Sequence, residues 1–179
     1  MTRLTVYDDR EPERILFTSS DPAAIAPKLR EINVGFERWD APIHISPDAE
    51  SETILDAFRP YLNTLMGATG AGSADVVKLT PDHPMAGALR EKFLQEHTHS
   101  EDEIRFFVAG SGHFVIHEGG KVYVALCEAG DLIRVPAGAR HWFDAGRAPE
   151  FTALRVFTHT EGWVAQFTGD TISDRFPLA

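Results

Sequence analysis

Short runs of Val, Ile, Leu and Phe dominate the second half of the chain and alternate with glycine-rich turns. After residue 93 the runs return roughly every eight to twelve residues, separated by Gly110, Gly120, Gly130 and Gly138. Short strands at this spacing, joined by glycine turns, are typical of an antiparallel sandwich or barrel. The pattern predicts strands near residues 93–99, 103–109, 113–118, 121–127, 131–135, 140–145, 151–158 and 163–167.

The first half of the chain has a different pattern, because part of it follows a helical period. Apolar residues between 51 and 65 recur at steps of three and four, the spacing of one buried helical face: Ile54, Leu55, Phe58, Leu62 and Leu65. Ser20 or Asp21 before Pro22 is typical of a helix start. We predict helices over 23–32, 51–65 and 84–93, strands over 3–7, 14–18 and 76–80, and a helix stop at Gly67–Gly72.

Composition limits the class of protein. The chain has 179 residues, of which 43% are hydrophobic and 25% charged, and these values exclude collagen, disorder and a coiled coil. The length suits one compact domain with a real core. We expect a single domain over 1–179, in which a helix and strand part, 1–92, packs on a barrel core, 93–169.

The charge balance restricts the partners. Seventeen Lys and Arg face 27 Asp and Glu, so the formal net charge is −10. This charge argues against nucleic acid and against an anionic membrane surface, which both require basic protein groups. An anionic small molecule stays compatible with the sequence if Arg or Lys side chains gather locally. We also expect a monomer, because the surface is heavily acidic and no helix shows an obvious unpartnered apolar face.

Cysteine use and hydropathy indicate the compartment. The chain has one cysteine, Cys127, which excludes an intrachain disulfide and a zinc cluster made of cysteines. We expect its side chain to be a small buried apolar group. The first residues show no secretory signal, and no apolar run approaches the roughly 18 to 20 residues of a membrane span. These features favour a soluble, cytoplasmic protein.

Candidate metal ligands gather in one short segment. His97 and His99 are two residues apart, so on a strand both imidazoles project from the same face. Glu103 follows near a bend, and His141 lies on a distant strand that barrel closure can bring alongside. Three imidazoles and one carboxylate suit Fe, Ni, Co, Mn or Zn, and leave two positions open on a metal that prefers six ligands.

The two segments that carry these residues match known motifs. His97-x-His99-xxx-Glu103 is followed by six residues and Gly110, and the second segment reads Gly130-xxxxx-Pro136-x-Gly138-xx-His141. In these motifs the sequence resembles the cupin superfamily, although Glu91 and Ala145 depart from it at the motif ends. The wider runs His97 to Gly110 and Gly130 to Asp144, together with Phe157 to Gly169, are similar to the acireductone dioxygenase family.

This resemblance implies both a fold and a reaction. The implied fold is mainly β, an antiparallel cupin (jelly-roll) barrel with several helices mostly in the N-terminal half. The implied reaction belongs to methionine salvage and oxidises 1,2-dihydroxy-3-keto-5-(methylthio)pentene with O2. Fe(II) gives 4-methylthio-2-oxobutanoate and formate, and Ni(II) gives 3-methylthiopropionate, formate and CO. One Fe(II) or Ni(II) per chain is implied, on His97, His99, Glu103 and His141.

Other side chains are candidates for the same site. Arg105 lies two residues past Glu103, shares its strand face and supplies local positive charge; the resemblance links it to formation of the substrate dianion. Arg155 is expected either in the pocket or in a structural ion pair. The expected apolar wall for the methylthio tail consists of Phe93, Phe107, Phe143 and Trp163. The resemblance assigns Glu96 and Asp102 an auxiliary role in metal incorporation or conformational coupling; from the residues alone, each is a solvated acid or a partner that orients an imidazole.

Two other interpretations of the motifs stay open. The same ligand set serves other cupin enzymes, such as a metal-assisted isomerase or a different dioxygenase, and many cupins bind small molecules without turnover. A complete ligand set disfavours the binding module. His113 and His117 are expected to be an outward-facing pair that binds no metal.

Overall fold

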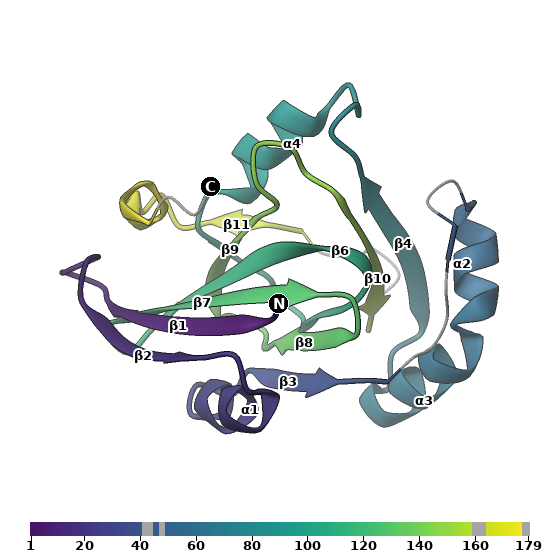
Figure 1. Ribbon diagram of the computed structural model, residues 1–179, viewed down its shortest axis with the longest axis horizontal. Coiled ribbons are helices and arrows are strands. Elements are labelled where there is room, and N and C mark those ends of the chain that lie inside the picture. The colour runs from purple at the N-terminus through teal and green to yellow at the C-terminus, as the bar shows by residue number, and fades with distance from the viewer. Residues whose placement is uncertain (41–44, 47–48, 159–163, 177–179) are drawn as a thin grey trace.

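The computed structural model describes residues 1–40, 45–46, 49–158 and 164–176 (Figure 1). Its helices are α1 Pro22–Arg30, α2 Ser51–Ala57, α3 Arg59–Thr69, α4 Ala86–Phe93 and a final 3-10 turn, Ile172–Arg175. Its strands are β1 Arg3–Asp8, β2 Ile15–Ser19, β3 Gly35–Arg38, β4 Ser73–Leu79, β5 His97–Thr98, β6 Glu103–Glu118, β7 Lys121–Glu128, β8 Asp131–Val135, β9 Arg140–Asp144, β10 Phe151–Phe157 and β11 Gln166–Phe167. No helix in the described ranges is long and apolar enough to cross a membrane.

One long strand, β6, joins two antiparallel sheets. Its first part pairs with β10 and β8, which pair in turn with β4 and β3. Its second part pairs with β7 and β9, in a sheet whose order is β11-β5-β9-β6-β7-β1-β2. The two sheets curve around a common interior, while α1 lies beside β2 and β3, and α2 beside β4 (Figure 1). The mainly antiparallel β barrel expected from the sequence is therefore present.

The predicted turn between strands 103–109 and 113–118 is wrong, because β6 runs through it. Gly110 adopts a φ of +68°, which re-aims the strand without reversing the chain. The backbone of β10 passes close by, since Phe151 is the cross-strand partner of Gly110. Glycine is required at this point because its missing Cβ makes room for the neighbouring strand.

Replacing Gly110 with alanine is expected to destabilise the fold by about 2–4 kcal/mol, because φ strain and overpacking act together. An added Cβ would lie 1.9 Å from the carbonyl oxygen of Glu150. Gly67→Ala is the control: Gly67 is in α3 with no atom within 4 Å of an added Cβ, so this change should stabilise by about 1 kcal/mol. Urea unfolding midpoints measure both effects, and equal midpoints for the two variants would contradict the argument.

The helix predicted over 51–65 forms as two helices. Phe58, with φ −95° and ψ 5°, breaks the ladder between α2 and α3. Pro60 explains the break, because in a continuous helix its ring would meet the carbonyl four residues earlier, whereas the first turn of α3 tolerates it. The second helix runs past Gly67 and ends at Gly70, whose φ is +71°. At α1 the expected cap is confirmed, since Asp21 accepts a hydrogen bond from the Ala23 N–H.

Other boundaries also differ from the expectation. The segment predicted as a strand over 93–99 begins with Phe93 in α4, and only His97–Thr98 pair as β5. The short strand β3, which pairs with β8, was not predicted. The strand expected over 163–167 begins outside the described residues, and inside them only Gln166–Phe167 is paired. Short strands carry too few residues to show a two-residue period in the sequence.

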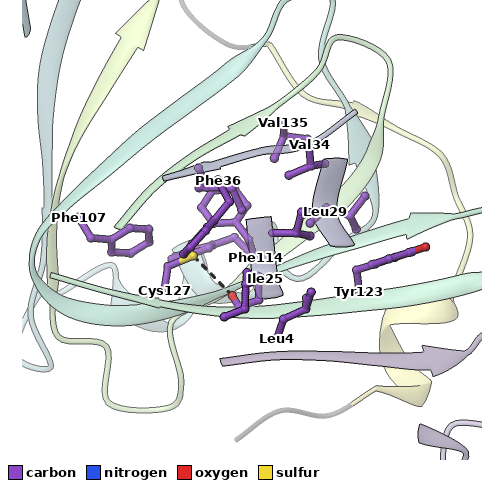
Figure 2. Close-up of a cluster of buried hydrophobic side chains, with 14 of the residues drawn as sticks. Leu4, Ile25, Leu29, Val34, Phe36, Phe107, Phe114, Tyr123, Cys127 and Val135 are labelled. Atoms are coloured by element: carbon purple, nitrogen blue, oxygen red, sulfur yellow. Dashed lines mark hydrogen bonds between the residues drawn. The ribbon is translucent and has the colours of Figure 1, made fainter. Parts of the chain in front are cut away.

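The main hydrophobic core fills the interior between the sheets. Figure 2 shows side chains from both sheets and from α1 gathered there, among them Leu4, Ile25, Phe36 and Phe107. Cys127 is 0% exposed in this cluster, as expected, and its burial raises the pKa of the thiol well above its ordinary value. Phe143 belongs to the same cluster and also lines the pocket described next, so the core directly supports that pocket.

Candidate metal centre and substrate pocket

The fold brings the four candidate ligands to one point. His97 lies on β5 and pairs in register with His141 on β9, while His99 follows β5 and Glu103 begins β6. Their ligand atoms all lie within 4.8 Å of one another. Each of these side chains is 7% exposed or less. Three imidazoles and a carboxylate therefore meet in a buried cluster, the arrangement that could hold a divalent cation.

Backbone carbonyls orient the three imidazoles. Nδ1 of His97 donates to the Gln95 carbonyl at 2.6 Å, Nδ1 of His99 to Val164 at 3.1 Å, and Nδ1 of His141 to Ala139 at 2.9 Å. A proton fixed on Nδ1 leaves Nε2 as the potential ligand atom. Nε2 of His99 and Nε2 of His141 lie 3.1 and 3.0 Å from Glu103 Oε2. The ring atoms that face inward are therefore those a metal would use.

The electrostatics favour the metal-binding forms of His97 and Glu103. At His99 burial opposes the protonated ring, but the carboxylate of Glu103 raises the pKa. Burial, together with the neighbouring His141, lowers the pKa of His97 to about 4, so this ring is neutral near pH 7. Burial opposes the charge of Glu103, but Arg105 and the adjacent rings of His141 and His99 hold the pKa of that carboxyl well below its usual value. Neutral imidazole and ionised carboxylate are the forms that bind metals.

A pocket of about 260 Å³ opens above the cluster. Polar groups occupy its floor, and apolar side chains form much of its wall. The lining residues are Leu89, Lys92, Phe93, His97, His99, Glu103, Arg105, His141, Phe143, Arg155, Ala165 and Phe167. A pocket with an apolar wall and a few convergent polar groups suits a small molecule that has a polar head and an apolar tail.

Arg105 occupies the pocket as its strand position indicated. Its side chain is 6% exposed, and Nη2 lies 2.8 Å from Glu103 Oε1. Its guanidinium carbon lies 4.7 Å from the centre of the Phe143 ring and 5.1 Å from that of Phe114. Burial lowers the pKa of Arg105, while Glu103 opposes this effect. The guanidinium packs against two neighbouring aromatic rings, whose centres are 5.1 Å apart, and lies beside a candidate ligand.

Arg155 satisfies both roles that the sequence left open. It lines the pocket and forms a bidentate ion pair with Asp75, with nitrogen to oxygen distances of 2.7 and 2.6 Å. Arg155 faces Asp75 on β4 and Arg105 on β6 as cross-strand partner. The carboxylate of Asp75 thus offsets one of two adjacent arginines.

Two of the four aromatic candidates line the pocket. Phe93 and Phe143 are on its wall, with ring centres 6.4 Å apart. Phe107 is 0% exposed in the core and packs against Phe143, so it lies behind the wall and not on its surface. This corrects the expectation that Phe107 contacts the methylthio tail directly. Both faces of that part of β6 are covered, so the alternation of apolar residues along the strand does not distinguish core positions from pocket positions. Trp163 lies outside the described residues.

The auxiliary acids are structural partners. Glu96 is 1% exposed; its carboxylate accepts from the Thr168 hydroxyl at 2.7 Å and lies 2.8 Å from Nδ1 of His117. Asp102 accepts from Arg134 at 2.6 Å and from the Ala137 N–H at 2.9 Å. Neither is a fully solvated acid, since Glu96 is buried and Asp102 fixes the loop before His141.

His113 and His117 share the face of β6 opposite to the interior residues Phe114 and Ile116, as expected, but this face is covered and His117 is not exposed. His113 is half-buried, and His117 is 6% exposed between Glu96 and Asp9, with Nε2 3.3 Å from Asp9 Oδ2. The physical reason is that the N-terminal hairpin and the segment before β5 cover this part of β6. His117 does lie outside the four-ligand cluster.

Several lining residues escaped the sequence analysis. Leu89 and Lys92 were missed. They lie three residues apart on α4, and the expected Phe93 lies four residues past Leu89, so the helical period predicted over 84–93 contained the signal that the three share one face. Phe167 gave no such signal, because it reaches the pocket through a two-residue strand, where its ring contacts His97 at 5.9 Å between centres.

Comparisons with known proteins agree with this site. Residues 3–165 match the model of the ARD/ARD' family. The chain is 63% identical to an acireductone dioxygenase of Acidiphilium cryptum, over 100% of this chain and 99% of the relative, and 60% identical to one of Gluconobacter oxydans, over 99% and 94%. The solved structure of an acireductone dioxygenase from Bacillus anthracis, with a cadmium ion in its active center, superposes with a TM-score of 0.81 at 29% identity, over 93% of this chain and 98% of that one.

These findings confirm the mainly antiparallel, cupin-like fold and the resemblance noted in the sequence. The family match covers most of the chain and includes all four candidate ligands. The chain therefore belongs to the ARD/ARD' family, the acireductone dioxygenases.

Proposed function

We propose that His97, His99, Glu103 and His141 bind one Fe(II) or Ni(II) per chain, and that this dioxygenase acts on 1,2-dihydroxy-3-keto-5-(methylthio)pentene. The observation that carries the proposal is the convergence of four buried ligand atoms within 4.8 Å at the floor of a pocket. The cadmium ion in the active center of the Bacillus anthracis protein supports a divalent cation in this family. The mixed nitrogen and oxygen donors suit Fe(II) and Ni(II).

The residues prepare the site for such an ion. The three carbonyl acceptors hold each imidazole in one orientation, so ligand geometry is set before binding. A bound divalent ion would act as a Lewis acid toward the adjacent oxygens of the acireductone and favour its deprotonated form. Fe(II) is expected to give 4-methylthio-2-oxobutanoate and formate, and Ni(II) 3-methylthiopropionate, formate and CO.

We propose that Arg105 stabilises the negative charge of the substrate. Its guanidinium packs against Phe114 and Phe143 at the pocket floor, where it can donate hydrogen bonds to an enediolate oxygen. A fixed cation in a buried site stabilises a developing anion more than water does, because it needs no reorganisation. Arg105 therefore favours loss of the second enediol proton and orients the resulting dianion. Arg155 supplies a second cation at the same pocket.

The apolar wall suits the methylthio tail. Phe93 and Phe143 offer aromatic surface beside the polar floor, and Trp163 belongs to the same proposal. Sulfur in a thioether makes favourable contacts with aromatic rings. Phe107 contributes by fixing the position of Phe143.

Glu96 and Asp102 fix the two ends of the segment that runs from β5 to the start of β6. Glu96 directly precedes His97 and contacts His117 and Thr168. Asp102 directly precedes Glu103 and accepts a hydrogen bond from Arg134. Outer partners of this kind tune metal binding by orienting ligands. We propose this positioning as the basis of their auxiliary role.

We further propose a single-domain monomer in the cytoplasm. The helices α1 and α2 pack directly on β3 and β4, which supports one domain over 1–179. The net charge of −10 favours a dispersed chain without nucleic-acid or anionic-membrane partners. The buried, reduced Cys127 fits a reducing compartment.

Anaerobic reconstitution of the metal-free protein with Fe(II) or Ni(II) tests the assigned function. On addition of the acireductone and O2, oxygen uptake is expected with both metals. Formate with the keto acid is expected from the iron form, and CO from the nickel form. Product analysis by chromatography and gas detection distinguishes the two. Stoichiometric metal binding without oxygen uptake would contradict the dioxygenase assignment and indicate another cupin activity.

A further inference from the structure

The pocket has a buried floor and an exposed rim. Its candidate ligands and Arg105 are 7% exposed or less, whereas Lys92 is exposed and Phe167 is 48% exposed. Lys92 lies near the end of α4, one residue before Phe93, and lines the same pocket. A ligand that enters from solvent meets the rim before it reaches the floor. The charge at the rim therefore acts on the approach of the ligand.

The two arginines of the pocket are each paired with a carboxylate of this chain. Arg105 lies 2.8 Å from Glu103, and Arg155 lies 2.6 Å from Asp75. The Arg155–Asp75 pair contributes little net charge at a distance, because its two charges are adjacent and opposite, while Arg105 lies buried at the floor beside the proposed metal ligand Glu103. An anion outside the pocket therefore feels these arginines weakly.

Lys92 differs from them in its surroundings. Within the described ranges Lys92 forms no ion pair, whereas Lys28 on α1 pairs with Glu31 at 2.7 Å. The acid four residues beyond Lys92 on the chain, Glu96, is buried and is engaged by His117 and Thr168. The ammonium group of Lys92 is thus a net positive charge at the rim of a protein whose formal net charge is −10.

We propose that Lys92 recruits the substrate: its ammonium group attracts the anionic acireductone to the pocket and holds the polar end over the floor during binding. The inference rests on the proposed function, because an enediol conjugated to a ketone is acidic and reaches the pocket as an anion. Local positive charge in a cleft raises the concentration of an anionic ligand even where the whole molecule is negative. Lys92 acts in binding and touches no reacting atom.

Three variants of Lys92 separate its charge from its packing. Lys92→Met removes the charge and keeps an unbranched stem of similar size, Lys92→Glu reverses the charge, and Lys92→Arg retains it. At low ionic strength we expect kcat/KM to fall about three- to tenfold in Lys92→Met and further in Lys92→Glu, mainly through KM. Lys92→Arg should stay within about twofold of the parent. The losses should shrink as salt rises, because the rim is exposed to screening.

A matched control removes the effect of overall charge. Lys121, at the start of β7, lines a different recess and is remote in sequence and fold from α4. Lys121→Glu changes the net charge by the same amount as Lys92→Glu, and it should leave KM near the parent value. Metal content of every variant is measured to confirm that the floor is intact.

Binding is also measured without turnover, by anaerobic titration of the acireductone into the metal-loaded protein. The dissociation constant should rise in Lys92→Met by the same factor as KM. This titration stays informative if the oxidation products differ from those expected, so failure of the catalytic assignment is distinguishable from failure of this inference. Three results would overturn it: unchanged affinity in Lys92→Met at low salt, equal losses in Lys92→Glu and Lys121→Glu, or losses that salt does not alter.

Discussion

Replacement of His141 with alanine is expected to abolish stoichiometric metal binding and to lower turnover by more than about 100-fold, since even the outer partners of metal ligands are worth 10–100-fold. The imidazole of His141 is 2% exposed, and its Nε2 lies 3.0 Å from Glu103 Oε2. Alanine removes one of four donors and leaves the carboxylate without that partner. The remaining donors come from β5, the residue after it and the start of β6, so the site opens on the side of β9.

The measurement is metal content after anaerobic loading, followed by oxygen uptake. His83→Ala is a suitable control, because His83 lies in the turn before α4, outside the cluster. Circular dichroism and thermal unfolding show whether the variant is folded. Glu103→Gln provides a second test with almost no change in volume, and it should lose metal to a similar degree. A His141→Ala protein with full metal content and normal turnover would remove His141 from the ligand set.

Much of the site could be predicted because its residues lie close together in the sequence, where spacing alone decides which side chains share a face. His97 and His99 share a face through the two-residue period of extended chain, and Glu103 and Arg105 share one in the same way. Both pairs lie in the pocket. Asp21 before Pro22 was similarly sufficient to place the start of α1, because capping depends on neighbouring residues.

The predictions that were wrong concern features that depend on chain segments distant in sequence. Whether the chain turns back at Gly110 or only changes direction depends on how β10 approaches. The helix break at Phe58 was missed because the apolar period continues on both sides of it. His117 is polar and was expected at the surface, but Asp9 and Glu96 supply partners from other segments. The meeting of His141 with His97 depends on strand register, which only the motif resemblance could anticipate.

Among substitutions that leave the metal ligands in place, removal of the Arg105 guanidinium should lower kcat/KM the most. Arg105→Ala is expected to lower kcat/KM by about 10²–10³, the range measured when one fixed donor to a developing oxyanion is removed. The side chain lies at the pocket floor, 2.8 Å from Glu103 and packed against two aromatic rings. Its removal takes away the cation that favours the enediolate, while His97, His99 and His141 keep their carbonyl partners.

Arg105→Lys distinguishes charge from geometry. Lysine keeps the positive charge but has no planar fork to pack against Phe114 and Phe143, so partial recovery, to within about tenfold of the parent, is expected. The absorption spectrum of the acireductone bound under anaerobic conditions reports its ionisation, because deprotonation of the conjugated enediol changes its near-ultraviolet band. The parent should bind the more ionised form and Arg105→Ala the less ionised one at the same pH. A metal-loaded Arg105→Ala protein with the parent spectrum and a normal kcat/KM would show that the ligand cluster controls substrate ionisation without Arg105.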